Sequence, residues 1–525
     1  MCCASLRSFL RPETAFFLVL WLLLQTTFRE RGFYDPGSLW HPVVGERILT
    51  DGLMTTDPFT HTFEGQTWIP QQWGMEVLMA LAKRAAGLDG LLLSFSVLTA
   101  LLFTWMFARM RASGMHWALA AAFTGALMFA GAFHFFVRPH MATIALLGWT
   151  MACLVDYDRG RVTVARLATL IPTYILWTNL HGGVLGGIMT FSLAFGGWSL
   201  QYLLGRGGPI RSMRELVLVC GILASCALTP FDNPFGLEML NTWQRIVGST
   251  VLKEVVKEHK ALDPTQLFDQ LVIGFGLFYC LLFIGVVPKL RSEFRVTWLI
   301  PFVWFVLSWK GIRQGPLFAI TAGIVLADFW KHTIWFELLK KHGDSLAYGE
   351  EFRWSFSAAL RTMVVPAVIV AASLGLILGG VAVPVVGHGW AKLDPEFYPT
   401  GLTLSIENEL RTTGPHAKLY NDANLGGYLI SEHPHRKIFM DDRFELYGDA
   451  WTRAYVDMLQ KAPERIEDYA DRFACTHALI VVLHDKEREA GLEASPMETY
   501  LAASPRWREI DRTVRAVFYR RVPMP

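Results

Sequence analysis

Charged side chains are scarce in this sequence: Asp, Glu, Lys and Arg make up 18% of its 525 residues. About 25% is usual for a soluble globular protein. Hydrophobic residues make up 52%, and they are concentrated in long apolar runs. Such runs are typical of membrane-spanning helices. The net charge of only +2 gives no overall attraction to nucleic acid. The sequence thus predicts an integral membrane protein without a nucleic-acid partner.

Cysteine is sparse as well, with seven residues, and four of them lie inside apolar runs, where a thiol behaves as a small hydrophobe. No C-x-x-C pair occurs, so the spacing supports neither a zinc site nor a redox site. We therefore assign no metal ligand and no cofactor from the sequence, which leaves any metal requirement of the protein open. Only Cys475 follows residue 390, so we expect no disulfide within that part of the chain.

About eleven apolar segments are candidate membrane helices, and those shorter than the roughly 20 residues that a span needs require tilt and flanking anchors. They cover about 14–28, 89–110, 116–136, 139–155, 163–178, 183–204, 214–229, 268–288, 296–309, 315–330 and 363–387. The first follows Arg7 and Arg11 and could belong to a signal peptide, but residues 25–29 offer no small-x-small cleavage site. We therefore expect a retained first helix.

The basic residues of the short loops predict an orientation. With the N-terminus in the cytoplasm, every inner loop is basic, as the positive-inside rule requires. These inner residues are Arg109 and Arg111; Arg159, Arg161 and Arg166; Arg206, Arg211 and Arg214; Lys289, Arg291 and Arg295; and Lys331, Lys340, Lys341, Arg353 and Arg361. The outer loops are then 29–88, 137–138, 179–182, 230–267 and 310–314. An odd number of spans leaves residues 390–525, called the tail below, outside the membrane.

The tail differs in character from the apolar segments before it. Helices are expected at 402–410, 449–459 and 465–473, and strands at 417–420, 428–430, 437–440, 478–483 and 516–520. Strands that alternate with helices indicate a small soluble α/β domain. We predict two parts: residues 1–389, an α-helical polytopic membrane domain with a first outer loop at 29–88, and the tail.

Polar residues gather at the outer ends of the predicted spans. They are Asp35, His41 and Asp57 in the first outer loop, Arg138 and His140 in the second, Asn179 and His181 in the third, Asp232, Asn233, Glu254, Glu258 and His259 in the fourth, and Lys310 and Arg313 in the fifth. Ionisable groups at membrane depth are expensive, and their default interpretation is functional. The alternative is that they anchor helix ends at the headgroup level.

Several short motifs, spread over nearly the whole chain, resemble one family. They are the stretch from Asp35 to His41, Asp57-Pro58-Phe59-Thr60, Arg138-Pro139-His140, Asn179-Leu180-His181-Gly182-Gly183, Asn233-Pro234-Phe235-Gly236, Asn421-Asp422, Gly426-Gly427-Tyr428-Leu429, Phe439-Met440-Asp441-Asp442-Arg443 and Tyr447-Gly448. With them the chain resembles bacterial lipid-linked-sugar glycosyltransferases of the GT-C superfamily, relatives of the dolichyl-phosphate-mannose protein mannosyltransferases. It departs from those relatives in lacking a clear Asp-Glu pair in the first outer loop.

The resemblance implies an inverting glycosyltransferase of the bacterial inner membrane, acting at its outer face. Its partners would be a polyprenyl-phosphate-linked sugar donor, membrane lipids, and a glycan, lipid or protein acceptor. Asp35 fits the acidic residue that acts on the acceptor. We expect His41, Asp57, Arg138, His140, Asn179, His181, Lys310 and Arg313 to bind substrate. Two alternatives stay open, a transporter or flippase of lipid-linked saccharide and a non-catalytic assembly protein.

Two local interpretations have structural alternatives. Arg138 and Arg313 stand in short outer turns where the positive-inside rule disfavours cations, so each needs a compensating anion. That anion is a lipid phosphate, or it is a carboxylate of the chain such as Asp35 or Glu258. In the tail, Gly426-Gly427 is expected to form a tight turn, and Asp441-Asp442-Arg443 is expected to form a structural salt bridge and turn.

Overall fold

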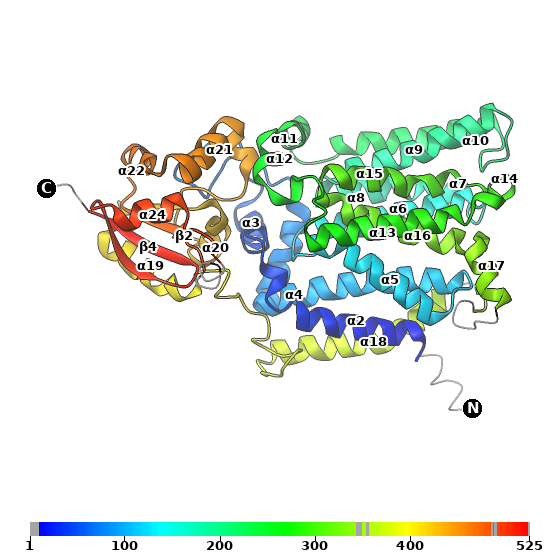
Figure 1. The fold of residues 1–525 in the computed structure, drawn as a ribbon, viewed down its shortest axis with the longest axis horizontal. Coiled ribbons are helices and arrows are strands. Elements are labelled where there is room, and N and C mark those ends of the chain that lie inside the picture. The colour runs from blue at the N-terminus through cyan, green and yellow to red at the C-terminus, as the bar shows by residue number, and fades with distance from the viewer. Residues whose placement is uncertain (1–9, 343–348, 353–355, 485–486, 488–490, 523–525) are drawn as a thin grey trace.

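The computed structural model describes residues 10–342, 349–352, 356–484, 487 and 491–522. The predicted inner residues Arg7 and Arg353, and also Cys2 and Cys3, lie outside them. A bundle of roughly parallel helices makes up most of the molecule, and the tail covers one end of it (Figure 1). The N-terminal helix begins at the opposite end of the bundle.

Each predicted apolar segment falls on a helix. These helices are α2 (Pro12–Thr27), α4 (Trp73–Ala112), α5 (Trp117–Gly131), α6 (His140–Asp158), α8 (Leu170–Leu180) after α7 (Val164–Ala168), α9 (Val184–Leu203), α10 (Met213–Leu228), α13 (Leu267–Ile284), α15 (Ile300–Lys310), α16 (Gly315–Phe329) and α18 (Phe356–Leu378). The last predicted segment ran nine residues too far, to 387. The chain is a polytopic α-helical membrane protein.

Six stretches of the described chain are long and apolar enough to cross a membrane, judged by length and composition. They are Trp73–Ala112, Trp117–His134, Met213–Phe231, Leu267–Ile284, Ile312–His332 and Ser357–Leu378. The other apolar helices are shorter or less apolar, and α15 has only 11 residues. A short helix needs tilt or anchoring residues at its ends to span a bilayer. The count of about eleven spans therefore stays a prediction.

The first outer loop is largely helical. It forms α3 (Gly37–Asp51) and the first half of α4, which bends where Ala86 and Gly87 leave helical geometry and Gly87 takes a φ of +59°. Helices α3 and α4 touch through their backbones, because a Cβ at Gly45 would lie 1.9 Å from the carbonyl oxygen of Glu76. This packing fixes the direction in which α3 leaves the bundle.

Shorter helices connect the bundle helices at both ends. They are α11 (Leu237–Gly248), α12 (Val251–Val255), α14 (Leu290–Glu293) and α17 (Ile334–Lys341), with 3-10 turns that include η2 (Ala132–His134), η4 (Lys257–His259) and η7 (Ile312–Gln314). Helices α3, α11 and α12 lie at the end of the bundle next to the tail, whereas α14 and α17 lie at the opposite end (Figure 1).

The tail is an α/β unit. Its elements are α19 (Thr403–Thr413), β1 (Leu419–Asn421), α20 (Ala423–Glu432), α21 (Phe444–Lys461), α22 (Ile466–Phe473), β2 (His477–Val481), α24 (Pro496–Ala503), β3 (Trp507–Arg512) and β4 (Ala516–Arg521). The sheet has the order β1-β2-β4-β3, with β1 parallel to β2 and the other pairs antiparallel. The predicted helices and three of the predicted strands are confirmed within a few residues. Residue 390 as the domain boundary stays a prediction.

Two predicted strands of the tail are wrong. Residues 428–430 belong to helix α20, in which residues 425–430 are all buried, so the helix is enclosed on every side and tertiary packing outweighs the local strand preference. Residues 437–440 form no strand beyond one bridge between Ile438 and Thr60. Helix α24 and strand β3 were not predicted.

The glycine pair Gly426-Gly427 does not make a turn either. Both residues lie inside α20, where a Cβ at Gly427 would come within 2.3 Å of the Pro36 carbonyl oxygen. A Cβ at Gly426 would come within 2.5 Å of Asp441 Cα. The pair therefore allows α20 to pack directly against the start of α3 and against the 441–443 segment.

Substituting Gly427 tests this packing. In Gly427→Ala the added methyl overlaps backbone, so we expect destabilisation by about 1–3 kcal/mol, as for other overpacked sites. The measurements are the thermal midpoint of the purified protein and the rate at which a protease releases the tail. The control is Gly248→Ala at the end of α11, where a Cβ meets nothing within 4 Å. Equal midpoints and equal cleavage rates in both variants would show that α20 docks differently.

Candidate active site

Asp35 sits at the start of α3 and faces Arg138. Its Oδ1 accepts a 2.8 Å hydrogen bond from the Gly37 backbone N–H, a turn that begins the helix. Its Oδ2 accepts from Arg138 Nη1 at 2.9 Å. Glycine at position 37 leaves room for the ion pair, because a Cβ would lie 2.8 Å from Asp35 Oδ1 and 2.9 Å from Arg138 Nε. The turn that precedes α3 thus accommodates the guanidinium of Arg138.

Arg138 also approaches a second carboxylate, Glu258 of η4, at 3.7 Å. The side chains of Asp35, Arg138 and Glu258 are 17%, 20% and 22% exposed, so the group is mostly withdrawn from water yet reachable. Burial raises the pKa of Asp35 despite Arg138. Burial also acts to raise the pKa of Glu258, but Arg138 and Arg313 outweigh it and lower that pKa. The structural alternative to a lipid phosphate at Arg138 was an ion pair with Asp35 or Glu258, and both of these ion pairs are present.

Arg313, on η7, has a different partner. Its Nη1 donates to His259 Nε2 at 2.7 Å, and among the described residues it forms no ion pair. Burial and then Arg313 lower the pKa of His259 to about 4, so this imidazole is neutral and accepts the bond. Arg313 therefore carries a charge that no carboxylate neutralises by direct contact. We call Asp35, Arg138, Glu258, His259 and Arg313 the ion cluster.

Histidines surround the ion cluster. The rings of His134 and His140 lie 4.1 Å apart, and His134 Nδ1 is 3.5 Å from Glu258. His181 Nδ1 accepts the Gly183 N–H at 3.0 Å and lies 2.8 Å from the Thr143 hydroxyl. The charged neighbours of His181 are Arg313, Arg138 and Glu258. Two of the predicted binding residues, His140 and His181, are thus brought to the cluster.

His41 is buried behind this group. Its Nδ1 lies 2.8 Å from Glu76 Oε1, and both side chains are 1% exposed. His41 Nε2 and Glu76 Oε2 have no hydrogen-bond partner among the described residues. Arg138, His181 and His140 are among its charged neighbours. His41 therefore borders the cluster from the α3–α4 interface and is not exposed to a substrate in this state.

The tail adds one carboxyl group. Trp40 Nε1 on α3 donates to Asp442 Oδ1 at 2.8 Å. Burial, and next the charge of Asp35, raise the pKa of Asp442 to about 8. The neighbouring Arg443 instead pairs with Asp441 at 2.6 Å and with Asp57 at 2.8 Å. The expected salt bridge at 441–443 is therefore present, but Asp442 is directed toward the ion cluster.

Three predicted binding residues, Asp57, Asn179 and Lys310, are not part of the ion cluster. Both carboxylate oxygens of Asp57 are used by Arg443 and by the turn at Phe59 and Thr60. Asn179 accepts from Trp73 Nε1 at 2.9 Å and donates to the Asp232 carbonyl at 2.9 Å. Lys310 is exposed at the end of α15. A substrate role for these three stays a prediction.

Several members of the site were not selected from the sequence. Glu258 and His259 were named among the polar residues of the fourth outer loop but were not selected as binding residues, and His134, Glu76 and Asp442 were not selected either. A signal for the first of them existed, because outer loop 230–267 was predicted on the same side as Arg138. No sequence pattern shows that the tail places Asp442 beside Trp40.

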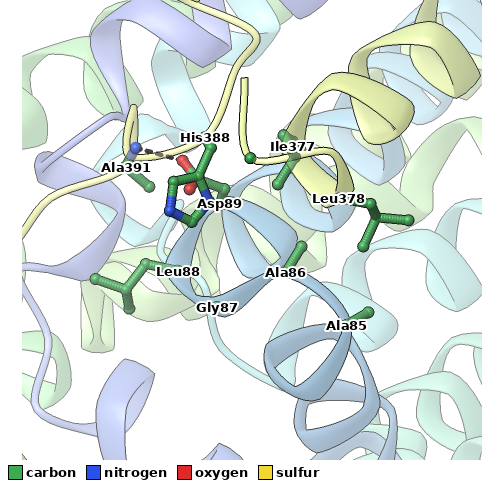
Figure 2. A pocket seen from close by; sticks show the side chains of 10 residues that line it. Ala85, Ala86, Gly87, Leu88, Asp89, Ile377, Leu378, His388 and Ala391 are labelled. Carbon is green, nitrogen blue, oxygen red and sulfur yellow. Dashed lines mark hydrogen bonds between the residues drawn. The ribbon is translucent and has the colours of Figure 1, made fainter. Parts of the chain in front are cut away.

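A cavity of about 470 Å³ lies elsewhere, where α4 bends against the end of α18 (Figure 2). Asp89 accepts the backbone N–H groups of Gly389 and Ala391 at 2.8 and 2.7 Å, which ties the segment after α18 to the bend. His388 and Leu88 are among the lining residues. This cavity shares no lining residue with the ion cluster.

The arrangement of the helices has counterparts among solved structures. The oligosaccharyltransferase of Archaeoglobus fulgidus, solved with a tethered acceptor peptide that contains an NVT sequon, is 13% identical with a TM-score of 0.50, and the match covers 89% of this chain and 69% of that one. ArnT of Cupriavidus metallidurans bound to undecaprenyl phosphate is 16% identical with a TM-score of 0.49, over 97% of each chain. The mycobacterial arabinofuranosyltransferase AftD is 12% identical with a TM-score of 0.44, over 97% of this chain and 41% of that one.

The sequence matches no protein-family model and no curated protein. The likeness to the oligosaccharyltransferase shows that this chain shares the fold of that membrane protein. The predicted fold class is thereby confirmed.

The raised pKa of Asp442 gives a pH-dependent test of its burial. Its ordinary pKa is 3.8 and its folded pKa is about 8, so the folded state binds the proton more tightly. The stability from this proton is present below the ordinary pKa and is lost as the pH rises through about 8. Asp442→Asn keeps the acceptor for Trp40 and cannot ionise.

We expect the thermal midpoint of Asp442→Asn to equal that of the wild type at acidic pH. Above pH 8 the midpoint of the variant should be roughly 2 °C or more higher than that of the wild type. Thermal midpoints from about pH 3.5 to about pH 9 measure this difference, which grows as the pH rises from the ordinary to the folded pKa. Asp457→Asn on the exposed face of α21 is the control, with no such trend. A constant difference between Asp442→Asn and wild type at every pH would show that Asp442 is not buried beside Asp35.

Proposed function

We propose that the protein transfers a sugar from a polyprenyl-phosphate carrier to an acceptor hydroxyl with inversion at the anomeric carbon. The observation that carries this proposal is the ion cluster. It joins four connecting segments at one end of the helix bundle, where a lipid headgroup and a water-borne acceptor can both arrive. The GT-C fold is consistent with this chemistry.

Arg313 is the group that we assign to the donor phosphate. Arg138 is already engaged by two carboxylates, whereas the side chain of Arg313, within the described part of the chain, hydrogen-bonds only to the neutral His259. A guanidinium presents a planar fork that matches two phosphate oxygens. An anionic phosphate therefore gains the most electrostatic stabilisation at Arg313. Arg138 instead serves to position Asp35. Lateral entry from the bilayer would bring the phosphate to the level of η7.

Asp35 is the proposed general base. A carboxylate has about four lone-pair sites, and here only the Gly37 N–H and Arg138 are seen to occupy them. Its remaining lone pairs can accept the acceptor proton while that oxygen attacks the anomeric carbon and the bond to the phosphate oxygen breaks. The raised pKa of Asp35 moves it toward the range in which a base is effective near neutral pH.

The phosphate leaves with the electron pair of the broken bond. Arg313 would stabilise the second negative charge that develops on it, and this is the charge stabilisation that such a reaction needs. No side chain has to form a covalent intermediate, so inversion follows from a single displacement. Positioning of the two substrates supplies the rest of the catalysis.

We place this site at the outer face of a bacterial inner membrane, with the N-terminus in the cytoplasm. The basic inner loops support this orientation, and the N-terminal helix begins at the end of the bundle remote from the tail (Figure 1). The tail would shape the acceptor entrance, because Asp442 and Trp40 border the cluster on its side. The acceptor would be a glycan, lipid or protein.

Replacing the base tests the proposal. In Asp35→Asn the side chain keeps its size but cannot take the proton, so the transfer rate should fall by about 10²- to 10⁴-fold. Transfer from radiolabelled undecaprenyl-phosphate sugars in membranes measures the rate, and binding of the carrier lipid should stay near the wild-type value. Asp51→Asn, at the exposed end of α3, is the matched control. Transfer at the wild-type rate in Asp35→Asn would assign the base elsewhere.

A further inference from the structure

One short turn supplies partners to both arginines of the ion cluster. In η4, Glu258 Oε2 lies 3.7 Å from Arg138 Nη1. The next residue, His259, accepts a 2.7 Å hydrogen bond from Arg313 Nη1 through its Nε2. Two adjacent residues of one 3-10 turn therefore treat the two cations differently, because one cation meets a carboxylate and the other meets an imidazole.

Backbone contacts hold residue 259 opposite Arg313. The Ile312 N–H on η7 donates to the Lys260 carbonyl oxygen at 3.1 Å. A Cβ at Gly311 would lie 3.5 Å from the His259 carbonyl oxygen, so the two segments run in close contact at this point. The place of residue 259 beside Arg313 is thus set by the backbone, and substitution of its side chain leaves that place intact.

The hydrogen bond to Arg313 determines the tautomer of His259. A guanidinium can only donate, so Nε2 accepts and Nδ1 carries the hydrogen. Glu258 Oε1 lies 3.8 Å from the same Nε2, but the neutral ring forms no ion pair with this carboxylate. His259 therefore orients the guanidinium of Arg313 and adds no negative charge to it.

The rest of the Arg313 guanidinium stays available to a ligand. Its Nε and Nη2 have no hydrogen bond within the described part of the chain, and neither nitrogen is a buried atom without a partner. Both donors therefore keep accessible surface, on a side chain that is partly exposed. Because His259 fixes Nη1, the edge formed by Nε and Nη2 has a defined direction. Two parallel N–H groups of such an edge match two oxygens of one phosphate.

We propose that His259 is a positioning residue that makes Arg313 selective for the phosphate of the donor lipid. Its neutral ring holds Nη1 and leaves both the charge and the Nε–Nη2 edge of Arg313 to the phosphate. A carboxylate at position 259 would hold the same Nη1 but would neutralise the guanidinium, as Asp35 does for Arg138. The inference rests on the proposed assignment of the donor phosphate to Arg313, and it adds the feature that distinguishes this arginine from Arg138.

Three substitutions at position 259 separate orientation from charge. His259→Glu supplies a negatively charged acceptor, His259→Gln supplies a neutral acceptor, and His259→Leu supplies none. The purified full chain is titrated with undecaprenyl phosphate and, separately, with undecaprenol, which lacks the phosphate. The ratio of the two affinities measures the phosphate contact alone, because general damage to the lipid site weakens both ligands. A pH of about 8 keeps a carboxylate beside a guanidinium ionised.

We expect this ratio to fall roughly tenfold or more in His259→Glu, the usual effect of a lost charged hydrogen bond. His259→Gln should recover most of the wild-type ratio, because its amide oxygen accepts from Nη1 without a charge. The ratio in His259→Leu should lie between those of the other two variants. Ala261→Glu is the matched control, since it adds the same charge at an exposed position of the same loop and should keep the wild-type ratio.

The variant Arg313→Gln separates a failure of this inference from a failure of the proposed function. If Arg313→Gln lowers the ratio and His259→Glu keeps the wild-type ratio, Arg313 binds the phosphate whatever its partner, and the inference is overturned. A wild-type ratio in Arg313→Gln would instead contradict the phosphate assignment itself, and the inference with it. Should His259→Glu not fold, equal ratios in His259→Leu and His259→Gln would overturn the positioning role.

Discussion

The buried guanidinium of Arg138 is the constraint on which the site depends. A cation at the end of a membrane helix must be paired, and removing one partner of a buried pair is strongly destabilising. Asp35 and Glu258 supply the partners, and they come from segments more than a hundred residues away on either side in sequence. Pairing them therefore brings the start of α3, the turn before α6 and η4 to one place. Arg313 joins from the turn before α16 without a carboxylate of its own.

The tail is fixed to this centre by charged and aromatic contacts. Arg443 binds Asp57 of the first outer loop, while Trp40 of α3 binds Asp442. Gly427 allows α20 to lie against the Pro36 carbonyl, next to Asp35. Asp35 and Asp442 thus hold their positions through the same interface between α3 and the tail. A tail that moved away would change both the acceptor side of the site and the pKa of Asp442.

Sequence alone could predict which segments meet. Alternating basic loops put residues 29–88, 137–138, 230–267 and 310–314 on one side, and their side chains do form the ion cluster. It could not show which charges pair, because pairing is decided by packing over long sequence distances. Tyr428 to Ile430 have strand-favouring side chains, yet docking on Pro36 makes them helical, a tertiary effect that outweighs propensity. The partners of Gly427 and Asp442 likewise lie about 400 residues away.

Binding of undecaprenyl phosphate to single-residue variants tests the assignment of the phosphate site most directly. Arg313→Gln should weaken binding by about 1.5–3 kcal/mol, the usual contribution of a charged hydrogen bond. Arg138→Gln should have a smaller effect on binding, because Arg138 is held by Asp35 and Glu258. Lys260→Gln, at an exposed cation of the loop that carries Glu258, should bind as the wild type does. Unchanged affinity in Arg313→Gln would contradict the account, because the lipid phosphate would then be held outside the ion cluster.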